Sequence, residues 1–321
     1  MRTSIKHTKL NTTPKRNPSP GRSAALVCLG GACYGFNATA YKLAYGMGFS
    51  AAQIAAAQMW CSFMLYAILF AGEALQGRER SRIGRLTAAK LFGAGCTTCC
   101  TSIFYTYAMS VLPMPLALTL LFQFTWIGTL IQTISTRKMP AINQVASAVI
   151  IMFGTVFASG LYRTDLSTCS PLGIAAGLAA AVCCASFLAL SGHIQTECSQ
   201  AQRGLVICAG SVAASHLISP DFLVSGVLLK GIAPLGLVAG ACGFFLPVLL
   251  FSIGTPSLPT GVTTILAASE LPAGLLVAMV VLDEPIGAIE WLGVAIILAG
   301  VCISQLQFLP KGSSRKSAAK S

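Results

Sequence analysis

The chain alternates between long apolar stretches and short polar ones, and the apolar stretches are continuous rather than alternating in character. A helix that crosses a bilayer needs about 20 mostly apolar residues, whereas a membrane strand would show polar and apolar positions in alternation. Lipid offers the backbone no hydrogen-bond partners, so we expect α-helices. The pattern predicts an all-α integral membrane protein with ten spans, at residues 24–44, 51–71, 91–112, 116–134, 142–161, 172–191, 204–218, 232–253, 262–282 and 288–306.

Composition supports a lipid environment for most of the chain. Hydrophobic residues make up 55% of the sequence and charged residues only 9%, whereas a soluble domain carries about 25% charged residues. Most of the 13 cysteines lie inside the apolar stretches. Because the chain does not carry two Cys-x-x-Cys pairs at zinc-ligand spacing, the cysteines indicate small core residues rather than disulfides or a metal site. We therefore expect a multi-pass protein of the plasma membrane that needs no cofactor.

The positions of Lys and Arg predict the orientation. A net charge of +12 is compatible with nucleic-acid binding, but no such motif accompanies it, so we expect no nucleic-acid partner. With the N-terminus inside, all but three of the 21 basic residues lie on cytoplasmic segments, the exceptions being Lys42, Arg163 and Lys230. Cytoplasmic loops are enriched in Lys and Arg and can contact anionic lipid. Both basic tails, 1–23 and 307–321, are therefore predicted to be cytoplasmic.

Short sequence matches 146 positions apart indicate an internal repeat. Leu112-Pro113 recurs as Leu258-Pro259, and Gly154 recurs as Gly300. The fourth and fifth predicted helices thus align with the ninth and tenth, which divides the chain into five-helix halves at 24–161 and 172–306. Because five is odd, the second half is predicted to be inverted in the membrane. Inverted repeats are typical of alternating-access transporters.

Residues 258–304 carry the clearest likeness to a known family. Glu270, Glu284, Trp291-Leu292-Gly293 and Ile297-Leu298-Ala299-Gly300-Val301 stand in the order of that family's closing pattern. On these residues the chain resembles the ten-helix EamA-type members of the drug/metabolite transporter superfamily. The resemblance implies secondary transport and leaves the substrate open.

The first half is similar to the same family at fewer positions. Tyr34-Gly35-Phe36-Asn37 followed by Lys42 resembles the family's opening helix. Gln58 stands where many relatives carry arginine, so a contact of that arginine with an anionic substrate does not carry over to this chain.

Glu270 is the leading candidate for a functional side chain because it lies in the middle of the ninth predicted helix. A charged side chain there costs about 2.5–3.5 kcal/mol. Thr263 and several small residues share its face, which can line a cavity; the alternative is a tight helix contact around a buried, hydrogen-bonded acid. Pro272, like Pro247 in the eighth helix, is expected to bend its helix. The other predicted residues of the substrate or proton pathway are Asn37, Lys42, Tyr105, Gln123 and Trp126.

No catalytic signature accompanies these residues: the chain has no Walker loop, HExxH or Gly-x-Ser-x-Gly motif. We therefore expect a non-enzymatic secondary transporter, with export the favoured direction, of a small metabolite, amino acid or drug-like compound. Protons are the candidate coupling ion. Two alternatives stay open. An intramembrane enzyme acting on lipid or polyprenyl substrates would need clustered acids or a His/Asp set at one membrane surface, and a receptor or scaffold would show no substrate flux.

The predicted topology can be measured with reporter fusions. Fusions after Arg78 and after Lys311 should both report the cytoplasm, because both positions lie in basic segments. A signal from the opposite side at either position would contradict the predicted number of spans.

Overall fold

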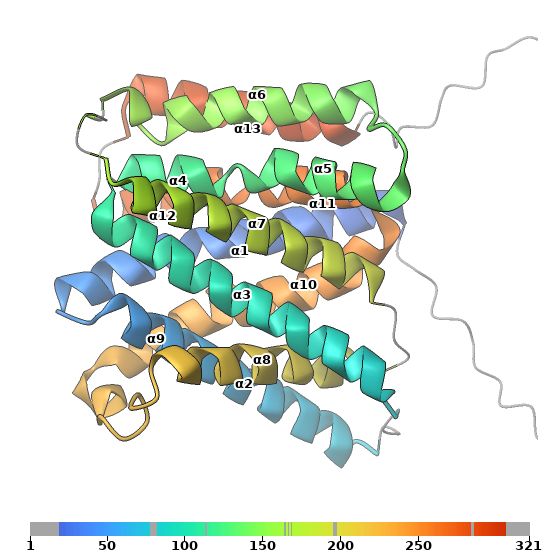
Figure 1. The fold of residues 1–321 in the computed structure, drawn as a ribbon, viewed down its shortest axis with the longest axis vertical. Helices are drawn as coiled ribbons and strands as arrows, with labels where there is room; N and C mark the ends of the chain where they lie inside the picture. The colour runs from blue at the N-terminus through green and yellow to red at the C-terminus, as the bar shows by residue number, and fades with distance from the viewer. Residues whose placement is uncertain are drawn as a thin grey trace, which may run out of the picture.

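The computed structural model describes residues 19–77, 82–112, 114–163, 165, 167, 169–194, 198–283 and 286–305. Within these residues every regular element is a helix (Figure 1). They form ten helical segments, three of which are interrupted: α1 (Pro20–Gly46), α2 (Ala51–Leu75), α3 (Arg85–Val111), α4 with α5 (Met114–Leu121, Phe124–Thr136), α6 (Ile142–Ala158), α7 (Pro171–His193), α8 (Gln200–Ile218), α9 with η3 and α10 (Ile232–Gly240, Ala241–Phe245, Leu246–Gly254), α11 with α12 (Thr260–Ala267, Glu270–Val281) and α13 (Ala288–Gln305).

By length and composition, five of these segments are able to cross a membrane. They are Ala51–Leu75, Leu116–Thr136, Pro171–Ser191, Ile232–Ser257 and Thr260–Val281, and α6 and α13 are shorter apolar helices. The prediction of an all-helical fold with ten helical segments is confirmed for the described residues. The more polar α1 and α3 carry many of the hydroxyl and amide side chains that line the cavities described below.

The helices pack closely where glycine allows one backbone to approach another. A Cβ atom added to Gly95 of α3 would lie 1.9 Å from the carbonyl oxygen of Ile207 in α8, and one added to Gly210 of α8 would lie 2.1 Å from that of Phe92. Small residues at such crossings gain dispersion contacts along the whole interface, which is how apolar helices associate without a hydrophobic driving force.

Pro247 interrupts the eighth segment as the sequence predicts. Proline cannot donate a backbone hydrogen bond to the residue four positions earlier, which here is Gly243. The turn before it widens into the π-helix η3, and the freed Gly243 oxygen accepts a hydrogen bond of 2.9 Å from Gln58 Nε2. Ser62 donates to Gly240 O over 3.0 Å. Two side chains of α2 therefore supply the donors that the irregular backbone lacks.

Two further interruptions recur at the repeat spacing. The fourth segment breaks at Phe122-Gln123 and the ninth at Ala268-Ser269, in each case after a helix of eight residues. The breaks lie 146 positions apart, and Ala268 is the residue whose carbonyl Pro272 leaves without its usual partner. The two non-glycine residues with positive φ among the described residues, Arg137 and Asp283, both with φ of 53°, have the same spacing.

The helices of the two predicted halves interleave. In Figure 1, α6 and α13 form a layer at the top, with α2 and α8 at the opposite end. Between them α1 packs against α10 and α12, and α7 packs against α3, α4 and α5, so each half inserts its first helix into the other. The interior between these layers holds the candidate site.

The bonds of Gln58 should stabilise the π-helix specifically. Gln58→Ala is expected to lower the free energy of unfolding in detergent by about 1–3 kcal/mol, because the buried Gly243 oxygen loses its donor. In a Pro247→Ala background the restored N–H can serve that oxygen, so the same substitution should cost less. Thermal unfolding of the four proteins of this double-mutant cycle measures the difference. Equal costs in both backgrounds would contradict this role for Gln58.

Candidate functional site

Two adjoining cavities lie in the interior, and Glu270 and Ala38 line both. The narrow cavity has a volume of about 60 Å³ and the wide cavity about 220 Å³. The side chains of the narrow cavity are mostly aromatic or hydroxyl-bearing: Tyr34, Asn37, Tyr41, Thr98, Thr101, Ser102, Tyr105, Cys184 and Phe187. Those of the wide cavity come largely from α1 and α12: Thr39, Lys42, Leu118, Ser159, Leu271, Leu275, Ala278 and Leu282.

Glu270 reaches this position because the helix break places it as the first residue of α12. Ser269 fixes the break by donating to the Cys28 oxygen of α1 over 2.7 Å. Gly31 and Gly35 bring α1 within contact of the same turn, since a Cβ atom at Gly35 would lie 2.5 Å from the Gly274 nitrogen. The N-terminus of a helix also favours a negative charge.

The Glu270 carboxyl group makes no hydrogen bond or ion pair with any residue that the structure describes. Its half-buried surface opens onto the two cavities. An isolated carboxylate away from water is unfavourable, so the group requires a proton, a cation or a hydrogen-bonding ligand from the cavity. The alternative of a tight helix contact around a hydrogen-bonded acid stays open in part: α1 and α12 pack closely at Gly35 and Gly274, but no described residue bonds to Glu270.

Tyr105 supplies a second unsatisfied group in the narrow cavity. Its side chain is only 8% exposed, and its hydroxyl has no hydrogen-bond partner. Buried polar atoms are normally paired, so an unpaired one beside a cavity is a candidate ligand contact. Asn37 is held differently: its Oδ1 accepts from Gln58 Nε2 over 3.3 Å, while Tyr41 donates to the Gln58 oxygen.

Gln58 therefore fixes the wall of the narrow cavity rather than entering it. Its side chain is 1% exposed, and its amide joins α1 to the π-helix of the eighth segment. The sequence singled out this position only as a departure from the family pattern. Cys184 and Phe187 of α7 were not predicted as site residues, although the predicted repeat makes α7 the counterpart of α1 and this equivalence was the available signal.

The remaining predicted residues lie at different distances from this centre. Lys42 is exposed and lines the wide cavity. Gln123 donates to the Thr119 oxygen over 3.0 Å and accepts from Trp126 Nε1 over 2.7 Å, and Trp126 is 39% exposed. Thr263 is buried and donates to the Pro259 oxygen over 3.2 Å. Gln123, Trp126 and Thr263 line neither the narrow nor the wide cavity.

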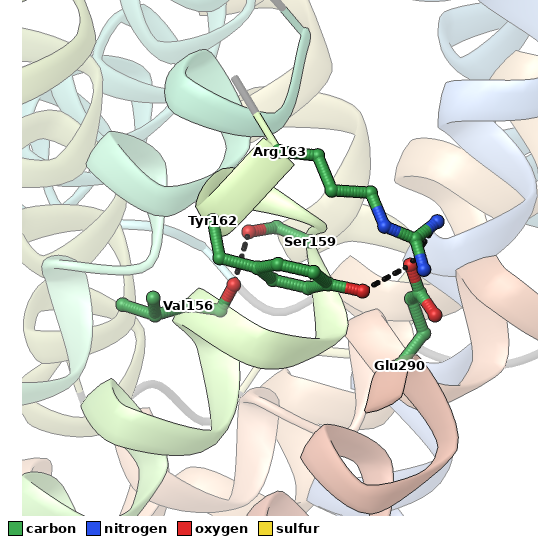
Figure 2. A network of polar contacts seen from close by, with 5 residues as sticks. All are labelled: Val156, Ser159, Tyr162, Arg163 and Glu290. Carbon is green, nitrogen blue, oxygen red and sulfur yellow. Dashed lines mark hydrogen bonds and ion pairs between the residues drawn. The ribbon is translucent and has the colours of Figure 1, made fainter. Parts of the chain in front are cut away.

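A separate polar cluster joins the connection after α6 to the start of α13 (Figure 2). Arg163 Nη1 lies 3.1 Å from Glu290 Oε1, which also accepts a 3.0 Å hydrogen bond from the Tyr162 hydroxyl. Partial desolvation and this hydrogen bond raise the pKa of Tyr162, since both oppose formation of the phenolate. Because Arg163 is 61% exposed at its side chain, the cluster stabilises α13 only modestly.

No group of three or more His, Cys, Asp or Glu residues is placed to hold a metal ion within the described ranges. Among the residues that the structure describes, Glu270 is the only acid on the walls of the narrow and wide cavities. The chemistry that these walls support is thus the reversible binding of a proton or a small polar molecule.

Comparison with known proteins defines the fold and leaves the activity open. No family model matches the chain, and no curated protein matches it. Among solved structures, 27 chains are similar. One, named "Crystal structure of protein", has a TM-score of 0.69 at 16% sequence identity, and the match covers 90% of this chain and 99% of that one. At this identity the likeness shows a shared helical fold only.

Tyr105 tests whether the narrow cavity receives a ligand. Tyr105→Phe should leave thermal stability within about 0.5 kcal/mol or raise it slightly, because the lost hydroxyl has no partner in the empty protein. If the hydroxyl contacts a ligand, apparent affinity should fall roughly three- to tenfold. Thr106→Val is the control for stability, since the Thr106 hydroxyl is bonded to the Ser102 oxygen of its own helix. A large loss of stability in Tyr105→Phe would contradict the assignment.

Proposed function

We propose that the chain is a ten-span secondary transporter of the EamA type that moves a small metabolite, amino acid or drug-like compound by alternating access, with export the favoured direction. The observation that carries this proposal is the unpaired carboxyl of Glu270, shared by two interior cavities at a helix break. An ionisable group in such a position between helices usually serves a substrate or proton pathway.

Membrane insertion is supported by what the helices expose. Five segments have the length and apolar composition of spans, and the outward faces of α6 and α13 carry large apolar side chains such as Val149, Phe153 and Leu298. A soluble monomer rarely leaves such continuous apolar surface in water. With the basic segments inside, both termini lie on the cytoplasmic side of the plasma membrane.

The inverted repeat is supported by the helix breaks. Two eight-residue helices at the repeat spacing, each followed by a break at the matching position, are expected when two related halves are built to one plan. The paired left-handed residues Arg137 and Asp283 end the following helices in the same way. Discontinuous helices near the repeat interface are where secondary transporters bind their substrates.

In the proposed mechanism, Glu270 alternates between a proton and the substrate. The desolvated carboxyl releases its proton only when a cationic or hydrogen-bonding group replaces it, which couples the two movements. Tyr105 and Asn37, which line the narrow cavity with Glu270, orient the substrate, and Lys42 at the wide cavity attracts an anionic portion of it. An intramembrane enzyme would need clustered acids or a His/Asp set at one membrane surface, and the described residues of these cavity walls include one acid, Glu270.

Glu270→Gln tests the coupling. The amide keeps the shape of the side chain but cannot titrate, so uptake against a substrate gradient driven by a pH difference should be lost in proteoliposomes. Exchange of labelled for unlabelled substrate should persist, because it requires no net proton movement. The control is Glu290→Gln, which changes a carboxyl that lines neither cavity. Wild-type accumulation by Glu270→Gln would leave Glu270 with a structural role.

A further inference from the structure

A third pocket lies at the end of the contact between α5 and α11 that is farther from Glu270. This end pocket has a volume of about 440 Å³ and is lined by Gln132, Ser135, Thr136 and Lys138 from the end of α5, by Ala141 and Gln144 from the start of α6, and by Leu258, Pro259 and Thr260 before and at the start of α11. Arg137 and Lys138 place it on the side proposed to be cytoplasmic.

Tightly packed residues separate the end pocket from Glu270. A Cβ atom added to Gly128 of α5 would lie 2.2 Å from Thr264 Cγ2 of α11. The Thr264 hydroxyl donates to the Thr125 oxygen over 3.1 Å. A Cβ atom added to Gly261 would lie 2.9 Å from Thr129 Oγ1. These residues leave no room for a solute between the two helices.

Residues 146 positions from those of this closed contact line the wide cavity, so the equivalent contact is open there. Thr125, Gly128, Thr129 and Gln132 correspond to Leu271, Gly274, Leu275 and Ala278, and all four of these counterparts line the wide cavity. Thr264 corresponds to Leu118, which lines it too. One set of repeat positions is therefore closed in one half and open in the other.

Hydrogen bonds reinforce the closed end. Gln132 Oε1 accepts from the Gly261 nitrogen over 2.7 Å, and Gln132 Nε2 donates to Gln144 Oε1 over 3.4 Å, which joins α5, α6 and α11. At the wide cavity, neither partner of the bond between Gln132 and Gly261 has an equivalent. Ala278 stands in place of Gln132, and Pro115, which has no backbone N–H, stands in place of Gly261.

We infer that the end pocket is the second mouth of the same pathway and that Gln132 is the latch that keeps it closed, so that the empty transporter rests with the wide cavity open. This inference rests on the proposed function. The inward-open state then requires α5 to leave α11, while α12 closes on α4 at the equivalent positions. Because the latch exists at one end only, the two states of the empty protein are unequally populated.

Accessibility of two matched probe positions tests the latch without requiring transport. Thr129→Cys places a thiol in the closed contact, and Leu275→Cys places one at the equivalent position of the wide cavity. A membrane-impermeant thiol reagent is added to either side of vesicles holding the full-length protein. Labelling of each engineered cysteine is read by peptide mass spectrometry, which separates it from the native cysteines.

In the Thr129→Cys protein, Gln132→Ala should raise labelling of residue 129 from the end-pocket side roughly three- to tenfold, as expected for the loss of one or two hydrogen bonds. In the Leu275→Cys protein, the same Gln132→Ala substitution should lower labelling of residue 275 from the wide-cavity side, since one population grows as the other shrinks. Ser135→Ala is the matched control, because Ser135 lines the end pocket outside the latch.

Unchanged labelling of residue 129 in the Gln132→Ala protein would overturn the latch, as would a comparable rise of labelling at both residues, which indicates general loosening rather than a shift between two states. Both results are independent of substrate flux. A protein that switches accessibility but transports nothing would instead contradict the proposed function, and one that transports without switching would contradict only this inference.

Discussion

The fold depends on one constraint: the irregular turns of apolar helices need hydrogen-bond partners from neighbouring helices, because lipid supplies none. Gln58 and Ser62 serve the π-helix before Pro247, and Ser269 and Thr264 carry bonds from the broken ninth segment to α1 and α5. The interruptions before Pro247 and at Ser269 are therefore also attachments between helices. The hydrogen bonds that satisfy the irregular backbone beside the cavities thus also connect neighbouring helices.

This constraint explains why Glu270 stands out. The amide of Gln58 forms hydrogen bonds with Tyr41, Asn37 and the π-helix, so its buried polar atoms are satisfied within the protein. Glu270 lies at a similar interruption, yet no described residue pairs with it. A buried amide with several partners stiffens a wall. A carboxyl with none depends on whatever occupies the cavity, and this dependence is what a coupled transporter requires.

The sequence predicted the helices well because length and apolarity decide them, and it placed Glu270 in mid-helix because charge is rare there. It also predicted bends at Pro247 and Pro272. It did not distinguish side chains that face a cavity from those that satisfy their own helix. Gln123 and Thr263 appeared equivalent to Tyr105 in the sequence, but their polar atoms bond to nearby backbone oxygens or to Trp126. That distinction depends on helix rotation and packing, which a single sequence does not specify.

The repeat adds information that neither composition nor a single site provides. Two related halves would close both ends equally if their sequences were alike at the α5–α11 contact and its counterpart. Gly128 and Thr264 pack without a gap, whereas Gly274 and Leu118 flank the wide cavity. The glutamine that bridges the closed end is an alanine at the open one. Under the proposed inverted repeat, these departures from symmetry determine which end is open, while the symmetry itself would allow the two ends to exchange roles.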